Sequence, residues 1–130
     1  MIADSSALIA ILLGEPESQV FDQAILAAPS CRISAPTFVE VSIIVETRTG
    51  AEGVLLWESM LRQSNIAIEA FTEEHAFLAR QAFSEFGKGR HPAGLNFGDC
   101  FSYALAKATG EPLLFKGDDF RKTDIIPALP

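Results

Sequence analysis

The stretch Met1-Ile2-Ala3-Asp4-Ser5-Ser6-Ala7-Leu8 predicts a short buried strand that ends in a carboxylate and leads directly into a helix. In proteins that alternate strands and helices, the carboxyl ends of the strands meet at one edge of the sheet, where ligands commonly bind. Asp4 is therefore a candidate functional residue. The same side chain could cap the following helix, as could Ser5 or Ser6, and capping does not exclude ligand binding.

Strands and helices continue to alternate along the rest of the chain. Strands are predicted at 32–34, 66–69 and 113–115, with a short edge strand at 125–126. Helices are predicted over 7–13, from Pro16 to near Pro29, from Ala35 to a turn bounded by Gly50 and Gly53, over 55–61, from Thr72 to residue 86, and from Asn96 to Gly110. Residues 87–98 are predicted as a loop. This order predicts an α/β fold, one domain over residues 1–130 with a mostly parallel central sheet flanked by helices.

The composition, 48% hydrophobic and 21% charged residues, is normal for a globular protein. The longest apolar run, 7–13, is too short for a membrane span and lacks the flanks of a secretory signal. Cys31 and Cys100 have neither a CxxC spacing nor a nearby histidine. They are predicted to be reduced core thiols, which favours a cytoplasmic location.

The net charge of −7 at first argues against a polyanionic substrate. Several of the negative charges belong to candidate site residues, however, whereas the basic residues concentrate in two short regions. These regions contain Lys88, Arg90 and His91, and Lys107, Lys116, Arg121 and Lys122. The sequence therefore allows a positive rim beside an acidic site.

Further carboxylates are predicted to converge on Asp4 through the fold: Glu40, Asp99, Asp118 and Asp119. Ala35-Pro36-Thr37 predicts a helix start that puts Glu40 in the first helical turn, and Asn96 predicts another just before Asp99. The last two acids follow a core strand. Carboxylates this crowded repel one another unless a cation lies between them, and oxygen ligands favour Mg²⁺ or Mn²⁺. The pattern thus predicts a metal site for phosphoester chemistry.

Each of these acids also has a purely structural explanation. Thr37-x-x-Glu40 and Asn96-x-x-Asp99 fit the capping box, in which the acid satisfies backbone N–H groups at a helix start. Gly117-Asp118-Asp119 suits a solvated turn. The coincidence of two acid-bearing helix starts at one sheet edge favours the metal site. A helix N-terminus would also lower the pKa values of these acids and keep them ionised for metal binding.

Polar residues beside the acids offer further candidates. Ser5 and Ser6 could hydrogen-bond the Asp4 carboxylate or a metal-bound water, or they could cap the helix. His75 lies in a helix rich in core residues and is most simply structural, whereas His91 is predicted to be exposed and is a candidate phosphate contact. No nucleophile elbow, Walker loop, dinucleotide fingerprint or zinc pattern is present in the sequence.

Taken together, these residues resemble those of PIN-domain ribonucleases, and within them those of the VapC-type toxins of bacterial toxin–antitoxin pairs. The resemblance runs over nearly the whole chain. Residues 1–8 look like the opening acidic motif, Glu40 matches the helix-borne glutamate, and residues 89–106 match the third acid, Asp99, with its neighbourhood. In the last motif Gly117 stands where many VapC-type chains carry an Asp. Asp119 then matches the second Asp, and Asp118 stands in for the first.

The resemblance implies a PIN-like three-layer fold and a Mg²⁺- or Mn²⁺-dependent endoribonuclease that cleaves single-stranded or loop RNA with a metal-activated water. The implied catalytic residues are Asp4, Glu40, Asp99 and Asp119, and the implied metal ligands are Asp4, Glu40, Asp99 and Asp118. Ser5, Ser6 and Asn96 would support the ligands, and Lys88, Arg90, His91, Lys116 and Arg121 would contact RNA. It also implies a homodimer and a small VapB-type antitoxin whose tail covers the active site.

Two alternatives remain open. A receiver or dehalogenase-like phosphoryl-transfer domain also places acids at strand ends. A receiver, however, needs an acid pair after the first strand, and a dehalogenase-like phosphatase needs Asp-x-Asp, where this chain has Ser6. A catalytically silent binding module with the same fold is the other alternative, and for such a module Mg²⁺ would not matter.

Overall fold

The strand predicted just before Asp4 forms as β1 (Ile2–Ala3) and lies inside the sheet. The computed structural model describes residues 1–130, and its sheet has four strands in the order β3-β2-β1-β4, all of them parallel. The other strands are β2 (Cys31–Ser34), β3 (Ile66–Glu69) and β4 (Leu113–Leu114). The predicted parallel α/β sheet is therefore confirmed.

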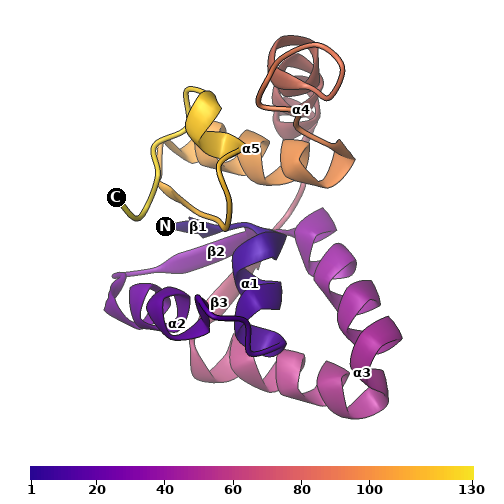
Figure 1. Ribbon diagram of the computed structural model, residues 1–130, viewed down its shortest axis with the longest axis vertical. Coiled ribbons are helices and arrows are strands. Elements are labelled where there is room, and N and C mark those ends of the chain that lie inside the picture. Colours follow the sequence, from indigo (N-terminus) through magenta and orange to yellow (C-terminus); the bar gives the residue numbers. More distant parts are fainter.

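Helices cover both faces of this sheet (Figure 1). They are α1 (Ser5–Leu12), α2 (Ser18–Ala27), α3 (Ala35–Gln63), α4 (Glu73–Phe86) and α5 (Phe97–Thr109), followed by the short 3-10 helix η1 (Phe120–Lys122). In Figure 1, α4 and α5 lie on one side of the strands, and α1, α2 and α3 lie on the other. The result is the predicted three-layer arrangement. None of the helices combines the length and the apolar character that a membrane span requires.

The core is divided in two by the sheet. Neighbouring strand residues point to opposite faces, so Leu113 packs with the α4 and α5 side chains, whereas Leu114 packs with those of α1, α2 and α3. Trp57 of α3 is fully buried on the second side. Cys31 and Cys100 are both buried and unpaired, as predicted.

The structure decides one open alternative and shows that two sequence predictions about element boundaries are wrong. Of the caps that the sequence allowed for α1, Asp4 is the one that forms, because its carboxylate accepts the Ser6 backbone N–H at 3.1 Å. The turn predicted between Gly50 and Gly53 is a kink: two helical segments of α3 meet directly at Gly50, whose φ of 72° suits glycine. The strand predicted at 125–126 does not form, because only an isolated bridge joins Leu113 to Pro127 there.

Candidate active site

Asp4 lies at the end of β1, at the edge of the sheet where α3 and α5 begin. Asp4 is only 2% exposed. One oxygen, Oδ2, accepts hydrogen bonds from the Ser6 backbone N–H at 3.1 Å and from the Ser6 hydroxyl at 2.7 Å. The other, Oδ1, accepts one from the Ser102 hydroxyl at 2.6 Å. Asp4 therefore caps α1 and is also held rigidly from two sides.

Glu40 lies in the second turn of α3, one turn later than the sequence predicted. The helix already begins at Ala35, with Ser34 as its cap residue, and Thr37 is a buried residue inside the first turn. The capping-box explanation for Glu40 is therefore wrong. Glu40 Oε1 is buried and has no hydrogen-bond partner. Burial raises the pKa of Glu40, the nearby Asp4 charge raises it further, and the Ser5 hydroxyl opposes both effects.

Asp99 forms the predicted capping box at the start of α5. Its Oδ2 accepts the Asn96 backbone N–H at 2.9 Å, and its own backbone N–H donates to Asn96 Oδ1 at 2.9 Å. Burial raises the pKa of Asp99 to about 6, a rise that the Asn96 hydrogen bond opposes and that the charges of Asp4, Asp119 and Glu40 reinforce. The capping role and the electrostatic coupling to the other acids thus coexist. The prediction that the helix starts keep the pKa values of Glu40 and Asp99 low is wrong, because burial outweighs the effect of the helix N-terminus.

The two acids after β4 differ in their relation to this cluster. Both Asp118 and Asp119 are exposed. Asp119 opens η1 without a side-chain capping bond, and its charge is one of those that raise the pKa of Asp99. Asp118 does not contribute to any of the pKa shifts of the cluster. The structure therefore brings Asp119, rather than Asp118, toward the other three acids.

The predicted basic residues are partly engaged within the chain. Lys116 Nζ pairs with Glu15 at 2.7 Å and with Glu17 at 3.3 Å. Arg121 donates to the carbonyl groups of Leu129 and Pro130.

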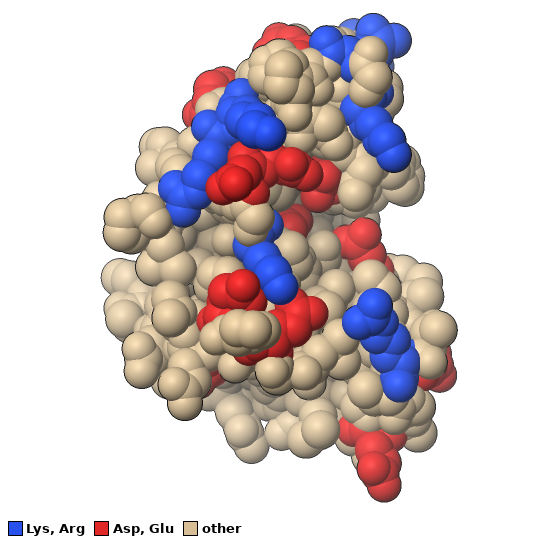
Figure 2. All heavy atoms as spheres, viewed as in Figure 1, with Lys and Arg blue, Asp and Glu red and all other residues tan.

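The 88–91 segment differs, because Lys88 and Arg90 are exposed and form no ion pair. The Arg90 guanidinium lies over the Phe83 ring, and His91 Nδ1 accepts the Ala93 backbone N–H at 3.0 Å. Figure 2 shows acidic and basic side chains intermingled on one face, with a hollow between the upper part, built by α4 and α5, and the lower part.

Sequence reasoning missed three residues that shape the site. Ser102 and Thr37 are each 1% exposed, and Ser102 donates to Asp4. Gly98 lies so close to Glu40 that a Cβ atom there would overlap the glutamate carboxylate. A helical-face argument could have found the two hydroxyls, because Ser102 follows Asp99 by one turn and Thr37 precedes Glu40 by one turn.

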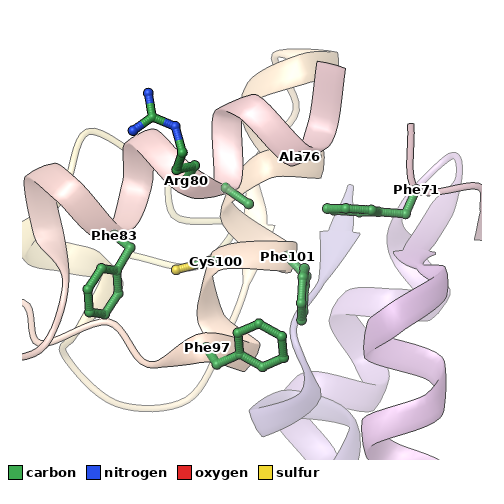
Figure 3. Close-up of a pocket in the computed structure, with 8 residues that line it drawn as sticks. Phe71, Ala76, Arg80, Phe83, Phe97, Cys100 and Phe101 are labelled. Atoms are coloured by element: carbon green, nitrogen blue, oxygen red, sulfur yellow. The ribbon is translucent and has the colours of Figure 1, made fainter. Parts of the chain in front are cut away.

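An apolar pocket of about 460 Å³ lies between α4 and α5 (Figure 3). Its lining residues are Phe71, Ala76, Ala79, Arg80, Phe83, Phe97, Cys100 and Phe101. A second groove shares Phe97 and Phe101 and reaches Glu40 and Gly98. Phe97 is 79% exposed, an unusual exposure for a phenylalanine. Apolar surface therefore leads directly to the edge of the acidic site.

The carboxylates of the site are the type of ligand that a hard divalent cation prefers. No three Asp, Glu, His or Cys side chains are gathered closely enough to enclose an ion as they stand. The donors are nevertheless all carboxylate oxygens, which Mg²⁺ and Mn²⁺ prefer. The buried Glu40 Oε1 lacks a partner. Burial is the main cause of the raised pKa values of Glu40 and Asp99, the neighbouring acid charges add to it, and a bound cation would favour the ionised form of both groups.

Comparison with known proteins agrees with this geometry. The family model described as the PIN domain matches residues 1–126. The chain is 45% identical over 125 residues to Ribonuclease VapC of Mycolicibacterium smegmatis, covering 96% of this chain and 97% of that one. It is 47% identical over 129 residues to Ribonuclease VapC42 of Mycobacterium tuberculosis, covering 98% of each.

Two solved structures share the fold at low sequence identity. Mycobacterium tuberculosis VapC20, described as a Sarcin-Ricin loop cleaving toxin, superposes with a TM-score of 0.78 at 15% identity, covering 96% of this chain and 95% of that one. A chain of a toxin–antitoxin complex from Klebsiella pneumoniae gives a TM-score of 0.70 at 18% identity, covering 95% and 92%. At these identities the likeness shows the fold alone.

Proposed function

The chain belongs to the PIN-domain family and, within it, to the VapC ribonucleases, and we propose that it is a metal-dependent endoribonuclease that acts as the toxin of a toxin–antitoxin pair. The observation that supports this proposal is the group of acids Asp4, Glu40, Asp99 and Asp119 at the carboxyl edge of the sheet. The charge of Asp4 raises the pKa of Glu40, and the charges of Asp4, Asp119 and Glu40 raise the pKa of Asp99. Membership in this family sets aside the receiver and dehalogenase-like alternatives. RNA is in the cytoplasm, which is where we propose that the protein acts.

Asp4, Glu40 and Asp99 would hold the Mg²⁺ or Mn²⁺ ion, with Asp119 completing the set. A cation bound there lowers the pKa of a water ligand and offsets negative charge on the phosphodiester. The chain itself keeps the carboxylates fixed: Asp4 accepts three hydrogen bonds, and Asp99 is held by the Asn96 cap. Glu40 Oε1, buried without a partner, is the oxygen that is free to orient an attacking water.

The RNA backbone would run along the basic residues beside the acids. Lys88 and Arg90 are exposed and free of ion pairs, so they are the first candidates, with His91 next to them. Lys116 and Arg121 would have to exchange their present partners for phosphates. The test is cleavage of a single-stranded RNA by the wild type and by Asp99→Asn in Mg²⁺. Equal cleavage by both proteins would contradict the proposal.

A VapB-type antitoxin is the partner that the names of the relatives and the toxin–antitoxin neighbour support. An antitoxin tail that places apolar side chains in the groove at Phe97 and Phe101 would bring a basic side chain to Glu40. Such a side chain would form charge-assisted hydrogen bonds with the acids and exclude the cation. The affinity of a tail peptide should therefore fall as Mg²⁺ rises at constant ionic strength, and an unchanged affinity would place the antitoxin elsewhere.

We also propose a homodimer. Beyond the kink at Gly50, α3 carries two large apolar side chains, Leu55 and Leu56, that are 66% and 65% exposed. Large apolar side chains that are this exposed are typical of an interface. Light scattering on the eluting protein distinguishes a dimer from a monomer.

A further inference from the structure

A pair of buried hydroxyl groups lies beneath the acids. Thr37 of α3 and Ser102 of α5 are each 1% exposed, and their Oγ atoms are 3.4 Å apart. Ser102 Oγ is also 2.6 Å from Asp4 Oδ1. This arrangement connects three elements, because Thr37 lies one turn before Glu40, Ser102 lies one turn after Asp99, and Asp4 ends β1.

The direction of these hydrogen bonds follows from the number of protons. An ionised carboxylate only accepts, so the single Ser102 hydroxyl proton points to Asp4. Ser102 Oγ can then only accept from Thr37, whose hydroxyl donates to it. Hydrogen bonds arranged in series polarise one another, so the Thr37 hydroxyl strengthens the donation from Ser102 to Asp4.

The hydrogen bonds to Asp4 leave little of its carboxylate free. A carboxylate has about four lone-pair positions, two on each oxygen. Both positions on Oδ2 are used, by the backbone N–H and the hydroxyl of Ser6. Ser102 uses one position on Oδ1. The remaining lone pair lies on Oδ1, the oxygen that Ser102 holds.

We propose that Ser102 is a positioning residue that, with Thr37 behind it, aims the one free lone pair of Asp4 at the divalent cation. This inference rests on the proposed metal-dependent function and adds a residue to it. Asp4 then binds the cation through Oδ1 alone. Without the Ser102 hydroxyl, Oδ1 loses its only donor, and the carboxylate can rotate away from the direction that the cation requires.

The test measures Mn²⁺ binding by calorimetry and does not depend on RNA cleavage. Ser102→Ala should weaken Mn²⁺ binding about tenfold, the lower end of the usual effect of losing a hydrogen bond to a metal ligand. In cleavage assays the half-saturating Mg²⁺ concentration should rise, while the rate at saturating Mg²⁺ recovers. If Ser102→Ala only destabilised the fold, the fraction of folded protein would fall, but the folded molecules would bind Mn²⁺ with unchanged affinity.

Ser34→Ala is the matched control. Ser34 is also 1% exposed and lies at the same sheet edge, but its hydroxyl has no hydrogen-bond partner. The variant removes an equally buried hydroxyl and should leave Mn²⁺ affinity unchanged. Thr37→Val should weaken binding less than Ser102→Ala does, and Thr37→Ser, which keeps the hydroxyl, should bind as the wild type does. If Ser102→Ala does not fold, Ser102→Cys replaces it, because a thiol is a weak donor of similar size.

The possible outcomes separate this inference from the proposed function. Tight Mn²⁺ binding by the wild type with the same affinity in Ser102→Ala would overturn the role of Ser102 and leave the metal site intact. An equal loss in Ser34→Ala would show that burial, and not the hydrogen bond, matters. A wild-type protein that binds no Mn²⁺ would overturn the metal site and this inference together.

Discussion

Glu40 of α3 and Gly98 of α5 lie so close together that only a residue without a Cβ fits at position 98 while Glu40 keeps its present position. Glycine at position 98 is thus explained by what faces it, because its φ is not positive. The acid on α3 and the start of α5 are fitted to each other, and this contact forms one wall of the site.

Gly98→Ala should therefore reduce RNA cleavage without destabilising the protein. The carboxylate is the far end of a flexible side chain and can move aside, and in the first turn of α5 alanine is no worse for the helix than glycine. A displaced Glu40 should lower the cleavage rate by roughly 10-fold to 100-fold, as misplaced catalytic groups do. Cleavage rates and urea unfolding of the two proteins check this. Full activity in a stable variant would show that Glu40 need not stay where it is.

Asp4→Asn and Asp99→Asn should both abolish cleavage but differ in stability without metal. Asn at position 4 would turn an NH₂ group toward a donor, because both Asp4 oxygens accept hydrogen bonds, and should cost about 1–3 kcal/mol. Asn at position 99 keeps an oxygen for the Asn96 backbone N–H and removes a charge, so stability should hold or rise. Denaturant unfolding in EDTA measures both. The metal-site assignment would be wrong if either variant cleaved RNA in Mg²⁺ as the wild type does.

The stability gained by Asp99→Asn should depend on pH. The pKa of Asp99 is raised from 3.8 to about 6 in the folded chain, so between these values the folded state binds more protons than the unfolded state. Ionised Asp99 thus lowers the free energy of unfolding above pH 6, and the penalty disappears as the pH falls toward 4. The variant should exceed the wild type by about 1–2 kcal/mol at pH 7, after allowance for partial exposure, and match it near pH 4. A difference that does not vary with pH would show that the Asp99 pKa is not raised.

Asp119→Asn should reduce cleavage more than Asp118→Asn. Both side chains are exposed, but only the Asp119 charge contributes to the raised pKa of Asp99. The two substitutions are chemically identical and adjacent, so each serves as the control for the other. Equal and negligible losses in initial rate would assign both residues to a surface turn.

The sequence predicted local structure well, but it could not predict contacts between residues that are far apart in the chain. The two residues of the Asn96–Asp99 capping box are three positions apart in the chain, so their spacing was sufficient to predict it. The bond from Ser102 to Asp4 joins residues 98 positions apart, and the overlap of Gly98 with Glu40 depends on how α3 and α5 pack. Neither pair has a local signature.

The start of α3 shows a different limit. Thr37 had the right spacing to Glu40 for a capping box, but Pro36 is accommodated inside the first turn and Ser34 becomes the cap residue. A shift of three residues therefore turned a predicted cap into a buried hydroxyl beneath the site. Sequence patterns locate helix starts less precisely than they locate helices.

The most direct test of a metal-dependent carboxylate site is RNA cleavage by one wild-type preparation in EDTA, after addition of excess Mg²⁺ or Mn²⁺, and after addition of excess Ca²⁺. Cleavage should be absent in EDTA and return with Mg²⁺ or Mn²⁺. Ca²⁺ should restore little, because it is larger and less strict in geometry. Asp99→Asn prepared in parallel should stay inactive throughout and so exclude a contaminating nuclease. Undiminished wild-type cleavage in EDTA would contradict the account.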